Sequence, residues 1–375
     1  MADDKAVIID IGSGTIKAGF VGDETPSVTF PSIVGRLRHS GVMIGQGRKS
    51  AFVGDEALQK RGALALRSPF ERGLVTDWDD LTELLRFAFQ QLDADPTAQP
   101  VLLTEPVLDP KENRQKLTQI LFETFQVPAM YLAPTGTLAL HAAGRTTGLA
   151  IDVGESVSQI VAVHEGFVVP KASARLAFAG HFVTDYLTKL MAEPGYGYSM
   201  TTAAERETVR DIKEKLAYVA EDFDAERERA AASSELDRNY ELPDGKAITL
   251  GDARFQCAEV LLKPSLVGLE QEGLHIETHS AIRRADPELR AQLYGNIVLA
   301  GGTSMLPGLC ERLQRDIASL APPSVKVKVV APENRRYGAF AGGSVLASLE
   351  TFESMWVTRA DYDEAGPAIV DKKCI

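Results

Sequence analysis

The sequence predicts an α/β protein built from two related lobes. Two stretches share one order of features, an apolar strand, an aspartate, a glycine turn and a second strand: Ala6–Phe20 and Leu149–Val163. They lie about 140 residues apart, and helical patterns separate the strands in between. A D-x-G turn recurs by chance in many sequences, but matching strands on both sides of it are much rarer. The repeat therefore indicates an internal duplication with two facing lobes.

The first stretch begins as an apolar, β-branched run that is typical of a buried strand and ends at Asp10. Gly12 and Gly14 permit a tight turn and leave room for a ligand against the backbone. The remaining polar residues of the loop are Ser13, Thr15 and Lys17. Such a loop could wrap phosphates in backbone N–H groups, with a carboxylate nearby for a hydrated metal. A plain β-hairpin with an Asp/Gly turn explains this stretch by itself equally well.

Two further turns extend the pattern. The second follows Asp152 and contains Gly154, Glu155, Ser156 and Val157. The third follows the strand Asn296–Ala300 and reads Gly301–Met305, with a helix expected from about Leu306. A Gly-Gly turn that opens a helix brings an N-terminus close to a ligand, although an ordinary strand-to-helix turn has the same pattern. Together the three turns predict a polyphosphate held from two lobes, a nucleoside above the third turn, and one metal between two aspartates.

Composition limits the classes of function. The net charge of −12 and a pI near 5.1 argue against nucleic acid as the main partner. Cys257, Cys310 and Cys374 are far apart and fit neither a disulfide framework nor a zinc site. The start of the chain is polar and acidic, and no apolar run is long enough to span a bilayer. We expect a cytoplasmic protein without membrane insertion.

Several helices and strands are predicted between the turns. A helix should follow Asp77, and another should start with Asp109 as N-cap and Pro110 as first residue and run to about Phe125. The small-residue stretches Pro134–Gly144 and Gly338–Leu349 are expected helices that connect the two halves. Val325–Val330 alternates like a half-exposed strand.

Two segments leave alternatives open. After the capping box Thr202–Glu205, the residues Arg210, Lys213 and Glu214 share a helical stripe, for which a solvated face with an internal ion pair is favoured over a ligand site. The segment His39–Gly54 contains four glycines and an apolar centre. It is predicted to be an exposed loop with an apolar tip, or else a hairpin around its own small core.

These motifs, taken together, resemble the actin family over almost the whole length. The matching stretches are the D-x-G-S-G-x-x-K-A-G-F loop, Phe30–Arg36, Val53–Ala57, Asn113–Tyr131, Gly144–Gly148, Thr184–Leu187, Ala204–Ala220, Tyr240–Gly245, Gly301–Thr303 and Tyr362–Pro367. The resemblance implies the actin-like ATPase fold of the sugar kinase and Hsp70 superfamily. In that fold, two duplicated RNase H-like lobes with insertions, four subdomains in all, surround a central nucleotide cleft.

The resemblance also implies boundaries. Residues 1–143 and 336–375 would form the outer lobe, with 32–68 as its second subdomain. Residues 144–335 would form the inner lobe, with 180–270 as its fourth subdomain. ATP or ADP would bind with Mg²⁺ or Ca²⁺, and Asp10 and Asp152 would hold the metal through water.

Further roles are carried over by matching positions. The nucleotide would contact the residues of the first two loops named above and the set Gly180, Arg210, Lys213, Glu214, Gly301, Gly302, Thr303, Met305, Leu306 and Arg336. The residues that would act in ATP hydrolysis, as catalytic residues, are Asp10, Thr135, Asp152 and Gln159.

Several positions depart from the family pattern. Thr135 replaces the glutamine that positions the attacking water, and Gln159 replaces a nearby histidine. The family's Asp-Gly in the second loop becomes Glu155–Ser156, its adenine-stacking tyrosine becomes Leu306, and its sensor-loop histidine becomes Arg72. Arg336 stands where lysine is usual, which keeps the charge but changes the shape. These changes leave nucleotide binding intact and predict weak or altered hydrolysis.

The resemblance implies assembly as well. His39, Val42 and Met43 match the loop that inserts into a neighbouring subunit, although a second methionine there is Gln46. Leu266, Val267 and Leu269 match an apolar plug between filament strands, and Val345, Leu346 and Leu349 resemble the cleft where actin-binding proteins dock. The expected function is a filament-forming, ATP-binding cytoskeletal protein that polymerises head to tail, with a slow ATPase. The alternative is a non-polymerising actin-related subunit of a larger complex with structural nucleotide; a small-molecule kinase ranks far below both.

Overall fold

The computed structural model describes residues 5–37, 51–242 and 244–374. Contacts between Cα atoms divide the chain into two compact units. Unit 1 comprises Met1–Thr146, Val163–Val168 and Tyr337–Ile375; unit 2 comprises Thr147–Ala162 and Val169–Arg336. Within the described ranges, no helix combines the length and the apolar character that crossing a membrane requires.

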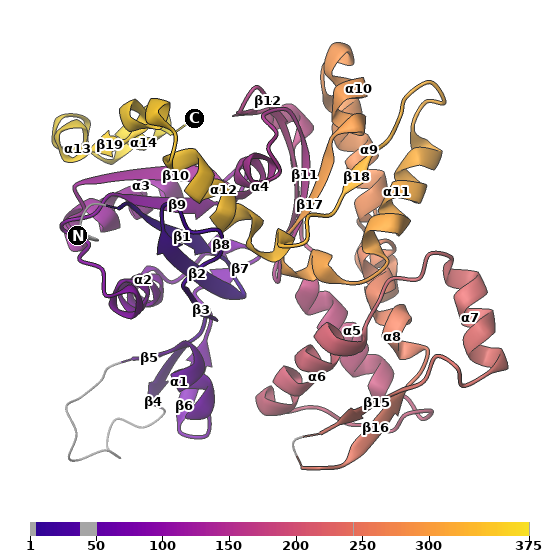
Figure 1. The fold of residues 1–375 in the computed structure, drawn as a ribbon. Helices are drawn as coiled ribbons and strands as arrows, with labels where there is room; N and C mark the ends of the chain where they lie inside the picture. The colour runs from indigo at the N-terminus through magenta and orange to yellow at the C-terminus, as the bar shows by residue number, and fades with distance from the viewer. Residues whose placement is uncertain (1–4, 38–50, 243, 375) are drawn as a thin grey trace. The chain divides into compact units, whose positions relative to one another are not determined.

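Unit 1 is organised around a mixed sheet that carries the first predicted loop (Figure 1). Over the described residues its strand order is β19 (Val357–Thr358), β10 (Ala129–Pro134), β9 (Val101–Glu105), β1 (Val7–Ile11), β2 (Thr15–Phe20), β3 (Val28–Pro31). The hairpin β1–β2 pairs Asp10 with Lys17, while β1, β9 and β10 run parallel. Asp10 therefore stands at the carboxyl end of a buried parallel strand, a common position for ligand-binding groups in α/β sheets.

Smaller sheets and helices complete unit 1. One smaller sheet has the strand order β5 (Phe52–Val53), β4 (Val34–Leu37), β6 (Leu64–Arg67), and a second consists of the pair β7 (Phe70–Glu71) and β8 (Leu74–Val75). The α-helices are α1 (Gly54–Gln59), α2 (Trp78–Leu92), α3 (Lys111–Gln119), α4 (Thr135–Ala142), α12 (Gly338–Ala347), α13 (Arg359–Ala365) and α14 (Val370–Lys373). A π-helical turn, η1 (Ile120–Thr124), follows α3, and the 3-10 turns are η7 (Glu350–Met355) and η8 (Pro367–Ile369). Apolar side chains of α2, η1 and the central strands form the core of this unit.

Helices α4 and α12 pack so closely that the backbone of one lies against the backbone of the other. A Cβ atom on Gly342 would lie 1.8 Å from the carbonyl oxygen of Leu138, so only glycine fits there. At Gly343 a Cβ would lie 3.1 Å from a methyl carbon of Ile8 on the sheet below. The two helices thus form a tight pair above β1, and each is next in sequence to a junction with unit 2.

Unit 2 repeats the motif on a second sheet. The strand order of this sheet over the described residues is β13 (Phe167–Val168), β12 (Ser158–His164), β11 (Gly148–Val153), β17 (Ile297–Ala300), β18 (Val329–Val330), with β14 (Ala174–Leu176) beside β12; β13 and the end of β12 fall in the segment Val163–Val168 that is assigned to unit 1. β11 and β17 are parallel, with Asp152 opposite Ala300. A separate hairpin pairs β15 (Arg238–Glu241) with β16 (Ala247–Leu250).

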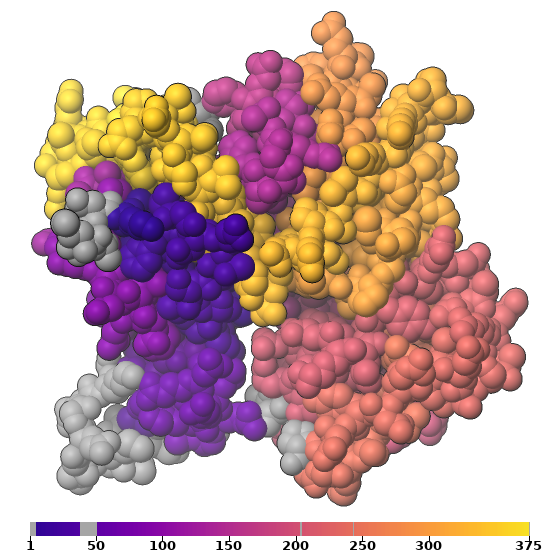
Figure 2. Space-filling view, in the orientation of Figure 1, coloured from indigo at the N-terminus to yellow at the C-terminus, as the bar shows by residue number. Residues whose placement is uncertain are grey.

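The helices of unit 2 enclose a large apolar core. They are α5 (Gly180–Met191), α6 (Ala203–Leu216), α7 (Phe223–Ala232), α8 (Ala253–Gln256), α9 (Leu274–Arg284), α10 (Pro287–Gly295) and α11 (Leu309–Leu320). The 3-10 turns are η2 (Pro170–Ala172), η3 (Cys257–Leu261), η4 (Pro264–Val267), η5 (Gly302–Met305) and η6 (Arg335–Tyr337). The segment containing α7 lies at the surface of unit 2 in Figure 2, in keeping with its lack of buried residues.

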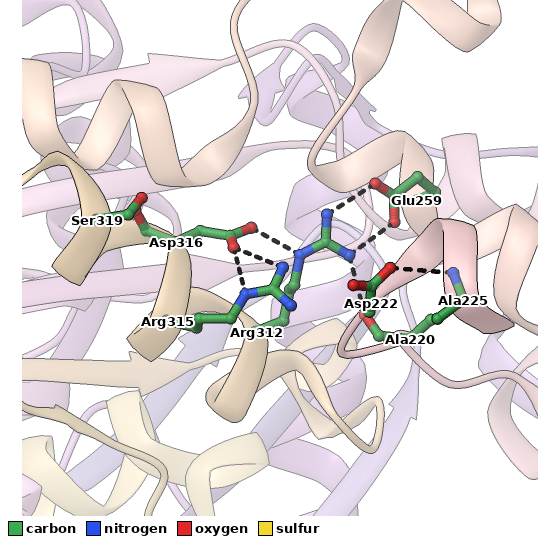
Figure 3. A network of polar contacts seen from close by, with 8 residues as sticks. All are labelled: Ala220, Asp222, Ala225, Glu259, Arg312, Arg315, Asp316 and Ser319. Carbon is green, nitrogen blue, oxygen red and sulfur yellow. Dashed lines mark hydrogen bonds and ion pairs between the residues drawn. The ribbon is translucent and has the colours of Figure 1, made fainter.

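A buried polar hub holds parts of unit 2 together (Figure 3). Arg312 on α11 donates through Nη1 and Nη2 to both carboxylate oxygens of Glu259, at 3.2 and 3.0 Å. It also donates through Nη1 to the carbonyl of Ala220 at 2.9 Å and through Nε to Asp316 at 2.6 Å. The Arg312 and Glu259 side chains are only 10% and 7% exposed, so the charges are paired away from water. One guanidinium thus ties α11 to η3 and to the segment leading into α7.

Two predictions of where a helix begins are confirmed, and a third is wrong. Asp77 caps α2 by accepting from the N–H of Asp80, and Thr202 and Glu205 form the capping box of α6. Asp109 does not cap α3: the N-cap residue is Pro110, without a side-chain bond. The predicted helix to Phe125 is divided, because it leaves α-geometry at Ile120 and continues as the π turn.

Other boundaries also differ from the prediction. The helix expected from Leu306 begins at Leu309, because Gly308 adopts φ 81° and a Cβ there would lie 2.1 Å from the carbonyl of Val219. Only Val329–Val330 of the expected strand pairs in a sheet. Most of the segment His39–Gly54 lies outside the described residues. Its last part is not an exposed loop, since Ala51, Phe52 and Val53 are buried.

Candidate functional site

The first loop is built around Asp10, which is 4% exposed. Lys17 on β2 donates from Nζ to Asp10 Oδ2 at 2.7 Å, because the antiparallel register places the two residues opposite each other. Thr104 on β9 donates to Oδ1 at 2.9 Å and accepts from the N–H of Ile11 at 2.8 Å. The carboxylate is thereby fixed in orientation at the strand end. Its oxygen chemistry suits a hard cation such as Mg²⁺, bound through water.

Of the two glycines in this loop, Gly12 is sterically required. A Cβ on Gly12 would lie 2.6 Å from the carbonyl oxygen of Thr15. The loop is held from β3's end by Ser32, whose hydroxyl donates to the Gly12 carbonyl and whose N–H donates to the Gly14 carbonyl at 3.1 Å. Ser13, Gly14 and Thr15 are half-buried. Sequence reasoning missed Thr104 and Ser32 as supports, because nothing near them in sequence marks a contact with the loop.

Thr135 is the first residue of α4 and follows Pro134, the last residue of β10. Pro134 is the N-cap of α4, and no side chain caps this end. Thr135 and the Asp10 loop both follow carboxyl ends of parallel strands in the same sheet, separated by β9. The substituted position is therefore in the same part of unit 1 as the first loop.

A neighbouring ion pair forms a separate network. Glu105 follows Thr104 on β9 and binds Arg114 Nε at 2.8 Å. Burial raises the pKa of Glu105 to about 7, against the attraction of Arg114. Arg114 also reaches Asp371 and the carbonyl of Cys374. This network anchors the end of the chain rather than the loop at Asp10.

The second and third loops meet within unit 2. The carbonyl of Gly154 accepts from the N–H of Gly180 at 3.0 Å and from the hydroxyl of Thr303 at 2.7 Å. A Cβ on Gly180 would lie 2.3 Å from Thr303 Oγ1, so the contact depends on glycine. Gly154 donates its own N–H to the carbonyl of Val157 at 3.1 Å, which closes the turn.

Asp152 lies directly beside the third turn. Gly301 adopts φ 85°, and a Cβ on it would lie 2.4 Å from Asp152 Oδ1. The next residue, Gly302, borders open space: a Cβ there would meet nothing within 4 Å beyond its own neighbours in the chain. The second carboxylate and the Gly-Gly turn thus form one cradle with room on the Gly302 side, which fits a ligand that approaches the backbone closely.

The charged stripe on α6 is divided. Arg210 and Glu214 pair on the surface, with 3.8 Å between Nε and Oε1, as the solvated alternative predicts. Lys213 does not fit that alternative: its side chain is 4% exposed and donates to the carbonyl of Gly180 at 3.1 Å. Its Nζ also lies 3.7 Å from Glu155. Lys213 therefore belongs to the second loop, and the favoured alternative of a solvated face with an internal ion pair holds for Arg210 and Glu214 but is wrong for Lys213.

The remaining nucleotide-site candidates are distributed over unit 2. Gln159 on β12 is buried, and Val157 is 8% exposed. Glu155 and Ser156 are half-buried. Leu306 is buried in the apolar core, whereas the adjacent Met305 is 41% exposed. Arg336 is the last residue of the unit.

The assembly candidates are only partly described. His39, Val42, Met43 and Gln46 lie outside the described residues. Leu266, Val267 and Leu269 are half-buried around η4, and the latter two pack against the core of unit 2. In unit 1, Val345 and Leu349 are 48% and 51% exposed, while Leu346 packs against the core.

Few protein groups in the described part of the chain are placed to bind a metal ion. Across the described part of the chain, no three His, Cys, Asp or Glu side chains are grouped closely enough to hold an ion. Asp10 and Asp152 each stand beside a glycine turn without space for a Cβ at Gly12 and Gly301. One carboxylate beside exposed backbone fits a cation that is bound mostly by water and phosphate oxygens.

Comparison with protein families agrees with this fold. A family model described as Actin matches residues 1–375, which is the whole chain. The mixed α/β architecture with its several sheets is that of an actin-like ATPase fold. The chain belongs to the actin family.

Proposed function

We propose that the chain binds ATP or ADP with a divalent cation and assembles head to tail into cytoskeletal filaments in the cytoplasm. The observation that carries nucleotide binding is the repeated strand-end loop. Each copy places an aspartate two residues before a glycine that closes a tight turn: a Cβ would lie 2.6 Å from the carbonyl oxygen of Thr15 at Gly12 and 3.0 Å from that of Val157 at Gly154. Each loop offers backbone and carboxylate groups to a phosphate–metal ligand.

The metal and the polar side chains have distinct roles in this proposal. Asp10 and Asp152 would hold a divalent cation through water, and that cation would neutralise charge on the phosphates. Lys17 holds Asp10 in place from 2.7 Å, and Lys213 fixes the second loop through Gly180. Hydrolysis is expected to be slow, since the shorter Thr135 replaces an amide side chain at the position of the attacking water.

Nucleotide binding is tested with Asp152→Ala. We expect weaker binding of a fluorescent ATP analogue in the presence of Mg²⁺, by about tenfold or more, because a charge partner of the cation is lost. Asp185→Ala is a matched control, because this carboxylate pairs with Arg206 on an exposed surface. Unchanged affinity and unchanged hydrolysis in Asp152→Ala would refute the role.

Assembly is tested by electron microscopy and sedimentation of the purified chain with ATP and Mg²⁺, at about ten to fifty micromolar. Filaments are the expected result. Their absence, with ATP still bound, would favour the second candidate, a non-polymerising subunit of a larger complex. That candidate draws its support from the altered residues Thr135 and Gln159 and from the half-buried side chains around η4.

A further inference from the structure

Helix α4 contains a buried imidazole nitrogen without a hydrogen-bond partner. His141 lies in the last turn of α4 and is half-buried. Its Nδ1 is fully buried, and within the described ranges no donor or acceptor lies in reach of it. One turn earlier, the hydroxyl of Thr137 is likewise buried and unpartnered over the same ranges. A protonated His141 would have to bury an additional N–H donor that finds no acceptor, which is unfavourable.

The surroundings of His141 offer no charge that would compensate. Helix α12, the main packing partner of α4, contains no titratable residue in Gly338–Ala347. Strand β10 contributes Tyr131, and Arg145 follows the end of α4. Burial lowers the pKa of His141, and neither of these groups nor any other charge contributes to the shift. The neutral imidazole is therefore the form that the packed helix accommodates.

The turn that contains His141 also ends the helix. Gly144, at φ 67°, donates its N–H to the carbonyl of His141 at 2.9 Å, and Arg145 donates to the carbonyl of Leu140 at 2.9 Å. These two bonds form a Schellman cap just before the junction at Thr146. Helix α4 is also packed tightly against α12, since a Cβ on Gly342 would lie only 1.8 Å from the carbonyl oxygen of Leu138. Hydrating the imidazole thus requires opening the last turn and its cap.

We propose that His141 is an acid-sensitive switch: when it takes up a proton, the last turn of α4 and its cap open. Because the pKa of this histidine is lower in the packed helix than in water, the opened state binds the proton more strongly. Falling pH therefore shifts the equilibrium toward the state in which the imidazole is hydrated. Because α4 begins at Thr135, opening its last turn also makes Thr135 less firmly held, and Thr135 is the residue proposed to stand at the position of the attacking water. This second step rests on the proposed function, whereas the opening itself does not.

Hydrogen exchange of the full chain without nucleotide tests the switch. Amide exchange in residues 135–145 is measured by mass spectrometry at about pH 7.5 and about pH 5.5 and corrected for intrinsic rates. We expect the opening equilibrium to rise about threefold or more at the lower pH, within the limit of about tenfold per pH unit for one proton. His141→Phe should abolish this pH response.

His279→Gln is the matched control, because the Nδ1 of His279 is already hydrogen-bonded to the hydroxyl of Tyr294 at 2.8 Å. The control should keep the wild-type pH response in residues 135–145. A pH response that persists in His141→Phe, or that also disappears in His279→Gln, would overturn the proposal.

Release of a fluorescent ATP analogue on the same variants tests the coupling to the nucleotide. Faster release at the lower pH in the wild type but not in His141→Phe supports it, and equal pH responses in both overturn it. A chain that binds no nucleotide would refute the proposed function, while the exchange experiment would still decide whether His141 is the switch.

Discussion

Replacing Arg312 by methionine should destabilise unit 2 by about 4 kcal/mol at pH 7, since breaking a buried ion pair from one side typically costs about 3–5 kcal/mol. The substitution keeps much of the side-chain volume but leaves the buried carboxylate of Glu259 without its cation. It also removes the donor to the carbonyl of Ala220 and the bond to Asp316. Figure 3 shows that these groups converge on the one guanidinium.

The part of this loss that comes from the unpaired carboxylate of Glu259 has a limit set by proton uptake. Burial already raises the pKa of Glu259, opposed by Arg312, and in the variant the carboxyl can protonate instead of remaining as an unpaired anion. From an ordinary value of 4.5, protonation at pH 7 costs at most about 3.4 kcal/mol, at about 1.36 kcal/mol per unit. At pH 5 the same limit is about 0.7 kcal/mol. Stability lost in the variant should therefore be largely recovered as pH falls toward 5.

The assay is urea unfolding followed by tryptophan fluorescence and circular dichroism at both pH values. The double variant Arg312→Met with Glu259→Gln should recover about 2 kcal/mol at pH 7, because no carboxylate is left unpaired. Arg315→Met is the control: this side chain is 44% exposed, and its loss should cost less than about 0.5 kcal/mol. A loss below about 1 kcal/mol for Arg312→Met, or equal losses at both pH values, would refute the reasoning.

Three further results are expected. Gly301→Ala should weaken binding of an ATP analogue by about tenfold or more, since a Cβ would lie 2.4 Å from Asp152 at φ 85°; Gly195→Ala, at an exposed position of unit 2 where a Cβ would meet nothing within 4 Å, should change it little, and similar effects would contradict this. Lys17→Met should lower the free energy of unfolding by about 3 kcal/mol, because it leaves Asp10 buried without a cation, as thermal melts will show. Thr135→Gln should speed phosphate release, measured with a coupled phosphate assay; no gain would count against a positioning role there.

Local sequence features predicted the strand-end loops well. The run before Asp10 forms β1, the return strand forms β2, and the same order recurs at β11 and β12. Apolar, β-branched runs bounded by glycine turns act over a few residues, so they can be read without tertiary information. The capping box at Thr202 was predictable for the same reason.

The supports of the loops were not predictable in this way. Thr104 is 94 residues from Asp10, and Lys213 is 33 residues from Gly180, so neither contact leaves a local pattern. The helix expected from Leu306 failed because Gly308 is held against the carbonyl of Val219, a contact from a distant segment. Where tertiary packing decides a boundary or the burial of a charge, spacing along the chain carries no signal.

The π turn after α3 has a consequence for chain length. Within Ile120–Thr124 each turn accommodates one residue more than an α-helix does, and Ile120, Leu121 and Phe122 all remain buried. The N–H of Phe125 accordingly bonds to the carbonyl of Ile120, five residues back. A segment with this geometry can lose one residue by reverting to α-helical winding while its ends stay in place. Single-residue deletions should therefore be tolerated here better than anywhere in β9 or β10, where a one-residue slip exchanges the two faces of the strand.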